Sequence, residues 1–140
     1  MTIYLDTSSL IKLYIDEAGS DAVRSLVDTA DVVATSVIAY AETRAALARL
    51  WREGKLSSSQ FASTKRQFQQ QWPRYFTLQV TDSLSRTAGE FAEHYRLRGY
   101  DSIHLASFAE IANSAGISGT RFSSFDDRLN QAAQKLSRTL

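Results

Sequence analysis

Short β-prone runs alternate with helical segments along almost the whole chain, and this alternation constrains the possible fold more than any other feature. Parallel strands must be joined by crossover connections, usually helices, so this order favours a parallel sheet with helices on both faces. In such sheets the ligand crevice lies beyond the carboxyl ends of the strands, where polar residues are the first candidates for a site. The predicted strands span residues 2–6, 31–36, 76–80 and 121–125.

The segments between the strands have helical spacing, and several carry residues that typically begin or end a helix. Gly54 follows one segment as a C-terminal stop, and the next segment restarts in KLSSSQF with a serine cap. Gly99 stops a later helix, and Asp101 opens the one after it. The predicted helices span residues 8–15, 20–28, 36–52, 57–72, 81–99, 101–116 and 126–136.

The composition is that of an ordinary globular chain and excludes several kinds of site. With 140 residues, 44% of them hydrophobic and 22% charged, we expect one domain over residues 1–140. Cysteine is absent, which excludes disulfides, a thiolate nucleophile and a cysteine zinc site. No basic leader or long apolar span precedes the first strand, so we expect a cytoplasmic protein without a membrane segment.

Four acidic residues occur in short, widely separated signatures. They are Asp6 in TIYLDTSSL, Glu42 in IAYAETRAAL, Asp101 in RGYDSIHLA and Asp126 in RFSSFDDRL. The first and last follow predicted strands, and the other two lie in helical segments rich in Ala, Leu and Ile. A carboxylate is costly to bury unless it is paired or holds a metal. The four acids therefore predict one oxygen-rich site for a hard divalent cation, and phosphodiester hydrolysis as its chemistry.

The expected cation is Mg²⁺ or Mn²⁺, because both prefer octahedral oxygen coordination. A bound cation acidifies water into a nucleophile and neutralises charge on phosphate oxygens, so no side-chain nucleophile is required. Thr7 and Ser124 lie next to the acidic signatures, and we expect their hydroxyls to orient ligands or water through hydrogen bonds.

Each acid also has a simpler structural explanation. Asp6 is a good residue to begin a helix, and either Asp126 or Asp127 could begin the last one. Asp101 could be the N-cap or an early-turn acid of its helix, where the helix dipole favours negative charge. Glu42 lies on an apparently buried helical stripe, where it could pair with a distant basic residue. We assign Asp126 to the site because it directly follows the predicted strand, and Asp127 to the solvent. His104 is expected to pack or to form hydrogen bonds, since a hard cation prefers oxygen ligands.

The net charge of +1 does not indicate nucleic acid, but the distribution of charge is uneven. The first 31 residues contain six acids against Lys12 and Arg24, whereas residues 44–74 contain seven basic residues and a single acid. A basic stretch can follow a phosphate backbone, so Arg44, Arg49 and Arg52 are candidate RNA-binding residues. The alternative is that these charges form the solvated faces of two surface helices.

In these signatures the sequence resembles the PIN-domain family, and within it the VapC-type ribonuclease toxins of prokaryotic toxin–antitoxin modules. The resemblance rests on YLDTSSLIKLY, AYAETRAAL, YDSIHLA and FSSFDDRLNQAA, in this order, and covers nearly the whole chain. It places the acidic quartet of the family on Asp6, Glu42, Asp101 and Asp126. The metal is then assigned to Asp6, Asp101 and Asp126. Ser124 matches the hydroxyl residue that stands two positions before the last acid.

The resemblance implies a three-layer α/β/α sandwich with a mainly parallel sheet of four to five strands. It implies an endoribonuclease dependent on Mg²⁺ or Mn²⁺, acting on an RNA such as tRNA, and a homodimer neutralised by a VapB-like antitoxin. The helices at about 36–53 and 57–72 would clamp a segment of that antitoxin. Four aromatic residues are candidates for apolar contacts there, or for packing between the two helices: Trp51, Phe61, Phe68 and Trp72.

Two other functions fit parts of the pattern. A phosphohydrolase of the haloacid dehalogenase type also uses an aspartate after the first strand, but its second aspartate would fall on Ser8. A catalytically degenerate PIN domain that only binds proteins is the non-enzymatic alternative. All four acids are present, which argues against loss of the site. A dinucleotide-binding domain is excluded because no G-x-G-x-x-G follows the first strand.

Overall fold

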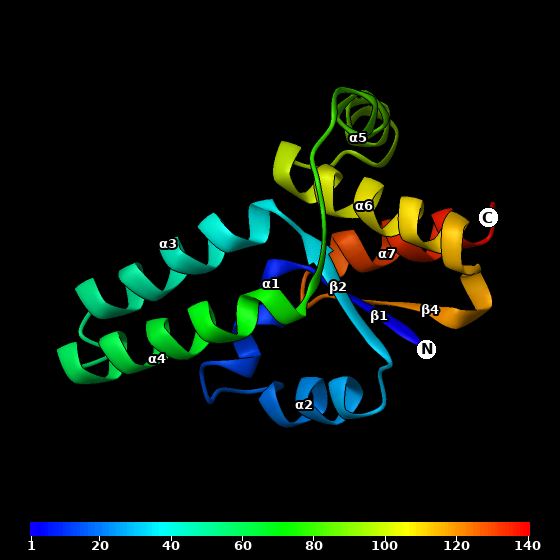
Figure 1. The fold of residues 1–140 in the computed structure, drawn as a ribbon. Helices are drawn as coiled ribbons and strands as arrows, with labels where there is room; N and C mark the ends of the chain where they lie inside the picture. The colour runs from blue at the N-terminus through cyan, green and yellow to red at the C-terminus, as the bar shows by residue number, and fades with distance from the viewer.

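A computed structural model describes all of residues 1–140, and its centre is a fully parallel four-stranded sheet in the order β3–β2–β1–β4 (Figure 1). The predicted parallel sheet is confirmed. Tyr4 in the central strand β1 pairs with Ala34 of β2 on one side and with Phe122 of β4 on the other. The strands are β1 (Thr2–Leu5), β2 (Val32–Ser36), β3 (Phe76–Leu78) and β4 (Thr120–Ser123).

Helices cover both faces of the sheet, which gives the expected three-layer α/β/α arrangement (Figure 1). Alternate residues of β1 point to opposite faces, as pleating requires. Ile3 and Leu5 pack with residues of α1, α2, α3 and α4, whereas Tyr4 packs with α6 and α7. The helices are α1 (Thr7–Leu10), α2 (Ser20–Asp28), α3 (Ile38–Arg52), α4 (Ser58–Gln71), α5 (Asp82–Tyr95), α6 (Gly99–Ala115) and α7 (Asp127–Ser137). Three 3₁₀ turns complete the chain: η1 (Ile11–Leu13), η2 (Trp72–Arg74) and η3 (Ile117–Gly119).

Several predicted helix ends are confirmed, and two are wrong. The helix predicted over residues 8–15 ends as an α-helix at Leu10 and continues only as the 3₁₀ turn η1. Ser57 forms a complete capping box with Gln60 at the start of α4, and Gly54 adopts φ +74° just after α3. Gly99 does not stop α5, because that helix already ends at Tyr95. Arg96 takes the left-handed conformation there, with φ 56°. Gly99 instead begins α6, so Asp101 does not open this helix but lies in its first turn, which confirms the early-turn alternative.

Helices α3 and α4 form a pair that extends away from the sheet (Figure 1). Trp51 and Phe61 stack at a centroid distance of 4.5 Å where the two helices meet beyond the core. Phe68 is fully buried and belongs to the core on this face. Of the two roles considered for it, packing is therefore confirmed, and contact with a partner is wrong. Trp72 is partly buried against the same core.

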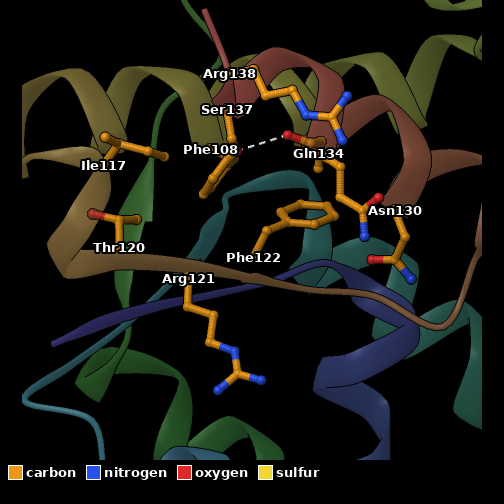
Figure 2. A pocket seen from close by; sticks show the side chains of 10 residues that line it. Phe108, Ile117, Thr120, Arg121, Phe122, Asn130, Gln134, Ser137 and Arg138 are labelled. Carbon is orange, nitrogen blue, oxygen red and sulfur yellow. Dashed lines mark hydrogen bonds between the residues drawn. The ribbon is translucent and has the colours of Figure 1, made fainter. Parts of the chain in front are cut away.

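On the other face, a cavity of about 440 Å³ lies between β4, the end of α6 and α7. Figure 2 shows Phe122 pointing from β4 toward α7, while its neighbour Arg121 points to the opposite side of the strand. Phe108 of α6 packs against Phe122 at a centroid distance of 5.1 Å. None of the helices combines the length and the apolar character needed to cross a membrane.

Candidate active site

Asp6 stands where β1 gives way to α1 at the carboxyl edge of the sheet. Its Oδ1 accepts hydrogen bonds from the backbone N–H of Ser9 at 3.0 Å and from the hydroxyl of Ser8 at 2.7 Å. Its Oδ2 accepts from the hydroxyl of Ser124 at 2.6 Å. Burial raises the pKa of Asp6, although these hydrogen bonds act in the opposite direction. The residue therefore caps α1, as the simpler explanation proposed, and is also a buried carboxylate without a basic partner.

Ser124 links Asp6 to Asp126 by hydrogen bonds where the paired strands β1 and β4 end. Besides donating to Asp6, the Ser124 hydroxyl accepts a hydrogen bond from the backbone N–H of Asp126 at 3.0 Å. Asp126 caps α7, because its Oδ1 accepts from the backbone N–H of Leu129 at 2.9 Å. Its other oxygen, Oδ2, faces the basic side chain of Arg98. Asp127 is exposed to solvent, which confirms the prediction made from the sequence.

Asp101 approaches the same place from α6, and Arg98 lies between it and Asp126. The Nε of Arg98 donates to Asp101 Oδ2 at 3.1 Å, and Arg98 Nη2 is 3.7 Å from Asp126 Oδ2. Burial raises the pKa of Asp101, and the negative charges of Asp126 and Asp6 raise it further despite the ion pair. A pocket of about 400 Å³ opens here, which we call the acidic pocket; its lining residues are Arg98, Asp101, Asp126, Asp127 and Arg128.

Glu42 of α3 is held by a separate set of hydrogen bonds. Its Oε1 accepts from the Thr7 hydroxyl at 2.7 Å and lies 2.9 Å from His104 Nε2. On the other side of the imidazole ring, the hydroxyl of Tyr4 lies 2.8 Å from Nδ1. Burial acts to raise the pKa of Glu42, but the bonds from His104 and Thr7 outweigh it and lower that pKa. His104 is therefore the hydrogen-bonding histidine that the sequence predicted.

The donor set fits a hard divalent cation, although the acids do not form a ready coordination shell. No three acidic or histidine side chains lie close enough together to hold an ion without rearrangement. Asp6 and Asp101 are nonetheless buried carboxylates, and burial raises the pKa of each. A cation between Asp101 and Asp126 would take the place that the Arg98 side chain occupies. Carboxylate oxygens are the ligands that Mg²⁺ and Mn²⁺ prefer.

Two residues that organise the site were missed in the sequence. Arg98 precedes Asp101 by three residues, a spacing that brings side chains together on a helix, and this was the available signal. Ser8 stands two residues after Asp6 and donates to it, but a serine in a turn carries no specific signal.

The predicted basic residues lie on α3, and none of them lines the acidic pocket. Arg44 donates to the Tyr40 hydroxyl at 2.8 Å. Arg49 lies 3.7 Å from Glu53 in an exposed ion pair, and Arg52 is exposed. Their role in RNA binding stays a prediction.

The family is decided by a comparison with models of known protein families, in which the model described as "PIN domain" matches residues 3–135. The chain belongs to the PIN-domain family. Its curated relatives include Ribonuclease VapC45 and Ribonuclease VapC49 from two strains of Mycobacterium tuberculosis. Each is 34% identical over 131 residues, which covers 94% of this chain and 88% of the relative. Ribonuclease VapC46 of the same organism is 31% identical over 134 residues, covering 96% and 92%. These relatives identify a VapC-type PIN domain.

Solved structures of low sequence identity share the fold of this PIN domain. Mycobacterium tuberculosis VapC20, described as a toxin that cleaves the sarcin–ricin loop, aligns with a TM-score of 0.67 at 20% identity, covering 93% of this chain and 94% of its own. PAE2754 from Pyrobaculum aerophilum aligns with a TM-score of 0.63 at 19% identity, covering 99% and 88%. FitAcB from Neisseria gonorrhoeae aligns with a TM-score of 0.64 at 17% identity, covering 94% and 93%.

Proposed function

We propose that this VapC-type PIN domain, acting as a single domain over residues 1–140, is a metal-dependent endoribonuclease toxin of a toxin–antitoxin module. The observation that carries the proposal is that Asp6 and Asp126 are linked through Ser124 and that both lie near enough to Asp101 to raise its pKa, in a chain whose curated relatives are named ribonucleases. The family match also removes the support for a haloacid dehalogenase-type phosphohydrolase.

In this proposal Asp6, Asp101 and Asp126 would hold Mg²⁺ or Mn²⁺, and Glu42 would complete the catalytic quartet. The chemistry supplied by such a cation would be an activated water molecule and charge neutralisation at the scissile phosphate. Ser124 fixes the Oδ2 of Asp6 and the backbone of Asp126, so both carboxylates keep their direction. Thr7 and His104 hold Glu42 ionised, because their hydrogen bonds lower its pKa. In that state Glu42 can accept a proton or a hydrogen bond from water at the reacting centre.

The test is cleavage of purified total tRNA and ribosomal RNA, in parallel reactions with Mg²⁺, with Mn²⁺ and with EDTA. Ribosomal RNA belongs in the assay because VapC20 is described as a toxin that cuts the sarcin–ricin loop. We expect discrete fragments with either metal and none with EDTA, since no side chain in the site can replace the activated water. Fragments of equal yield in EDTA would contradict metal-dependent hydrolysis.

We further propose that RNA follows the exposed face of α3, through Arg44, Arg49 and Arg52. Reversing two of these charges, in an Arg49→Glu/Arg52→Glu variant, is expected to weaken RNA binding and flatten its salt dependence. Each lost phosphate contact lowers the slope of log K against log salt by about 0.7 to 0.9. Filter binding of tRNA over a salt series measures this slope. An unchanged slope would place the RNA elsewhere on the molecule.

The partners that belong to this proposal are a structured RNA substrate such as tRNA and a VapB-like antitoxin. The working form in this proposal is a cytoplasmic homodimer. The stacked pair of Trp51 and Phe61 offers an apolar contact for the antitoxin where α3 and α4 meet, since 43% of Trp51 is exposed. Copurification of the adjacently encoded protein, and its release by a Trp51→Ser substitution, would support this contact.

A second function, a degenerate domain kept for protein binding, is favoured by one observation. The basic side chain of Arg98 already occupies the space between Asp101 and Asp126, and no ready metal cluster is present. Isothermal titration with Mn²⁺ separates the two functions, because a binding module need not take up the metal.

A further inference from the structure

A second pocket, of about 460 Å³, lies beside the acidic pocket between the C-terminal end of α5 and α7, and we call it the basic pocket. The face of α7 that lines it has helical spacing, with exposed residues at 128, 131 and 135 around the buried Ala132. The end of α5 supplies the opposite wall. The lining residues are His94, Tyr95, Arg96, Arg128, Gln131, Ala132 and Lys135.

The positive charges of the basic pocket are not neutralised within the chain. Arg96, Arg128 and Lys135 form no ion pair, and no acidic residue lines the pocket. The three residues come from two different segments, so the linear charge pattern did not reveal them. By contrast, Arg49 on α3 is paired with Glu53. Unpaired cations around a concave surface favour an anionic ligand.

One residue connects the basic pocket to the candidate active site. Arg128 lines both the basic pocket and the acidic pocket, and it lies only two residues after Asp126. Its Nη1 donates a long hydrogen bond of 3.5 Å to the backbone carbonyl of Arg96, which directs the guanidinium across the rim between the two pockets. A polyanion that extends from the acidic pocket toward the basic pocket would therefore contact Arg128.

We infer that the basic pocket binds a backbone phosphate of the RNA next to the phosphate that is cleaved. This inference rests on the proposed nuclease function and extends it to a substrate-positioning site. Arg96 and Lys135 would hold the phosphate from opposite walls, with Arg128 between the two pockets. A phosphate is favoured over a protein segment because none of the large exposed hydrophobic residues of the chain lines the pocket. Phosphate contacts of this kind position the nucleic acid without reading its sequence.

The decisive variant is Arg96→Gln/Lys135→Gln, studied in an Asp101→Asn background so that binding can be measured without cleavage. Both positions are exposed, and glutamine keeps most of the side-chain volume. Binding of fluorescently labelled total tRNA is measured by anisotropy over a salt series. We expect affinity to fall about tenfold at low salt, and the slope of log K against log salt to decrease in magnitude by about 1.

Two further proteins serve as matched controls. Arg121→Gln/Arg138→Gln removes the same charge from exposed, unpaired residues that line the cavity of Figure 2 instead, and its affinity should stay within about twofold of the parent. The charge-conserving Arg96→Lys/Lys135→Arg protein should retain the affinity and the slope of the parent. If the Arg121→Gln/Arg138→Gln protein loses as much affinity as the decisive variant, the effect is net charge alone and the inference is overturned.

The remaining outcomes separate the basic pocket from the nuclease function. If the wild-type protein cleaves RNA and the decisive variant binds RNA as tightly as its parent, the inferred phosphate site in the basic pocket is wrong. The proposed nuclease function is then unaffected. Neither binding nor cleavage of RNA by the wild type would overturn both. Loss of poly-glutamate binding with unchanged RNA binding would also overturn the inference, because the pocket would then take an acidic peptide.

Discussion

Cleavage of RNA by an Asp101→Asn protein is expected to fall about a thousandfold, which corresponds to about 4 kcal/mol of lost transition-state stabilisation. Asp101 is 9% exposed and lies opposite Asp126 across the acidic pocket. Asparagine keeps the size of the side chain but loses the charge that a divalent cation requires. The measurement is the single-turnover rate on the RNA that the wild-type protein cuts, with Mg²⁺ in excess.

The neighbouring acid provides the matched control. Asp127 also lines the acidic pocket but is exposed, and we expect Asp127→Asn to keep the wild-type rate within a few-fold. The reverse result, with Asp127→Asn inactive and Asp101→Asn active, would overturn the assignment of the site residues. Thermal unfolding of both proteins verifies that neither substitution unfolds the chain.

Manganese is expected to raise the melting temperature of the wild-type protein by about 5 to 10 °C when its concentration is about 100 times the Kd. Binding to the native state alone contributes about 2.7 kcal/mol at that ratio, and each kcal/mol shifts the melting temperature of a chain of this size by about 2 to 4 °C. The Asp101→Asn protein should show a much smaller rise. Equal rises in both proteins would show that the metal binds elsewhere.

Without metal, the Asp101→Asn protein should have a higher melting temperature than the wild-type protein. The pKa of Asp101 is raised in the folded state, mainly by burial, so its contribution to stability is complete below the ordinary pKa and is lost as the pH rises through the folded pKa. At neutral pH the ionised carboxyl therefore destabilises the metal-free protein. Asp101→Asn should melt higher than the wild type in EDTA at pH 7, and the two should converge in acid.

Local signals in the sequence were sufficient for much of the fold. Ser57 caps α4 through its own side chain, and the hydrogen bond that it accepts comes from Gln60, only three residues away. The same reasoning failed at the end of α5, because Arg96 adopts a left-handed conformation that glycine usually takes. An arginine gives no indication in the sequence that it will adopt a positive φ angle.

The site could be predicted only in part, for a related reason. The order of strands and helices placed Asp6 and Asp126 at one edge of the sheet, because the carboxyl ends of parallel strands meet there. The contacts that define their chemistry depend on how α6 packs. Arg98 reaches two acids from that helix, and His104 reaches back to Glu42 on α3. Such pairings follow from tertiary packing and have no local signature.

The hydroxyl that fixes Asp6 belongs to Ser124, which lies 118 positions further along the chain. During translation, β1 emerges before its neighbour β4 and the cap of α7 emerge. Until they do, the nascent polypeptide lacks Asp126, Ser124 and the entire basic face of α7. A site assembled from segments so far apart along the chain cannot form before the later of them has been synthesised.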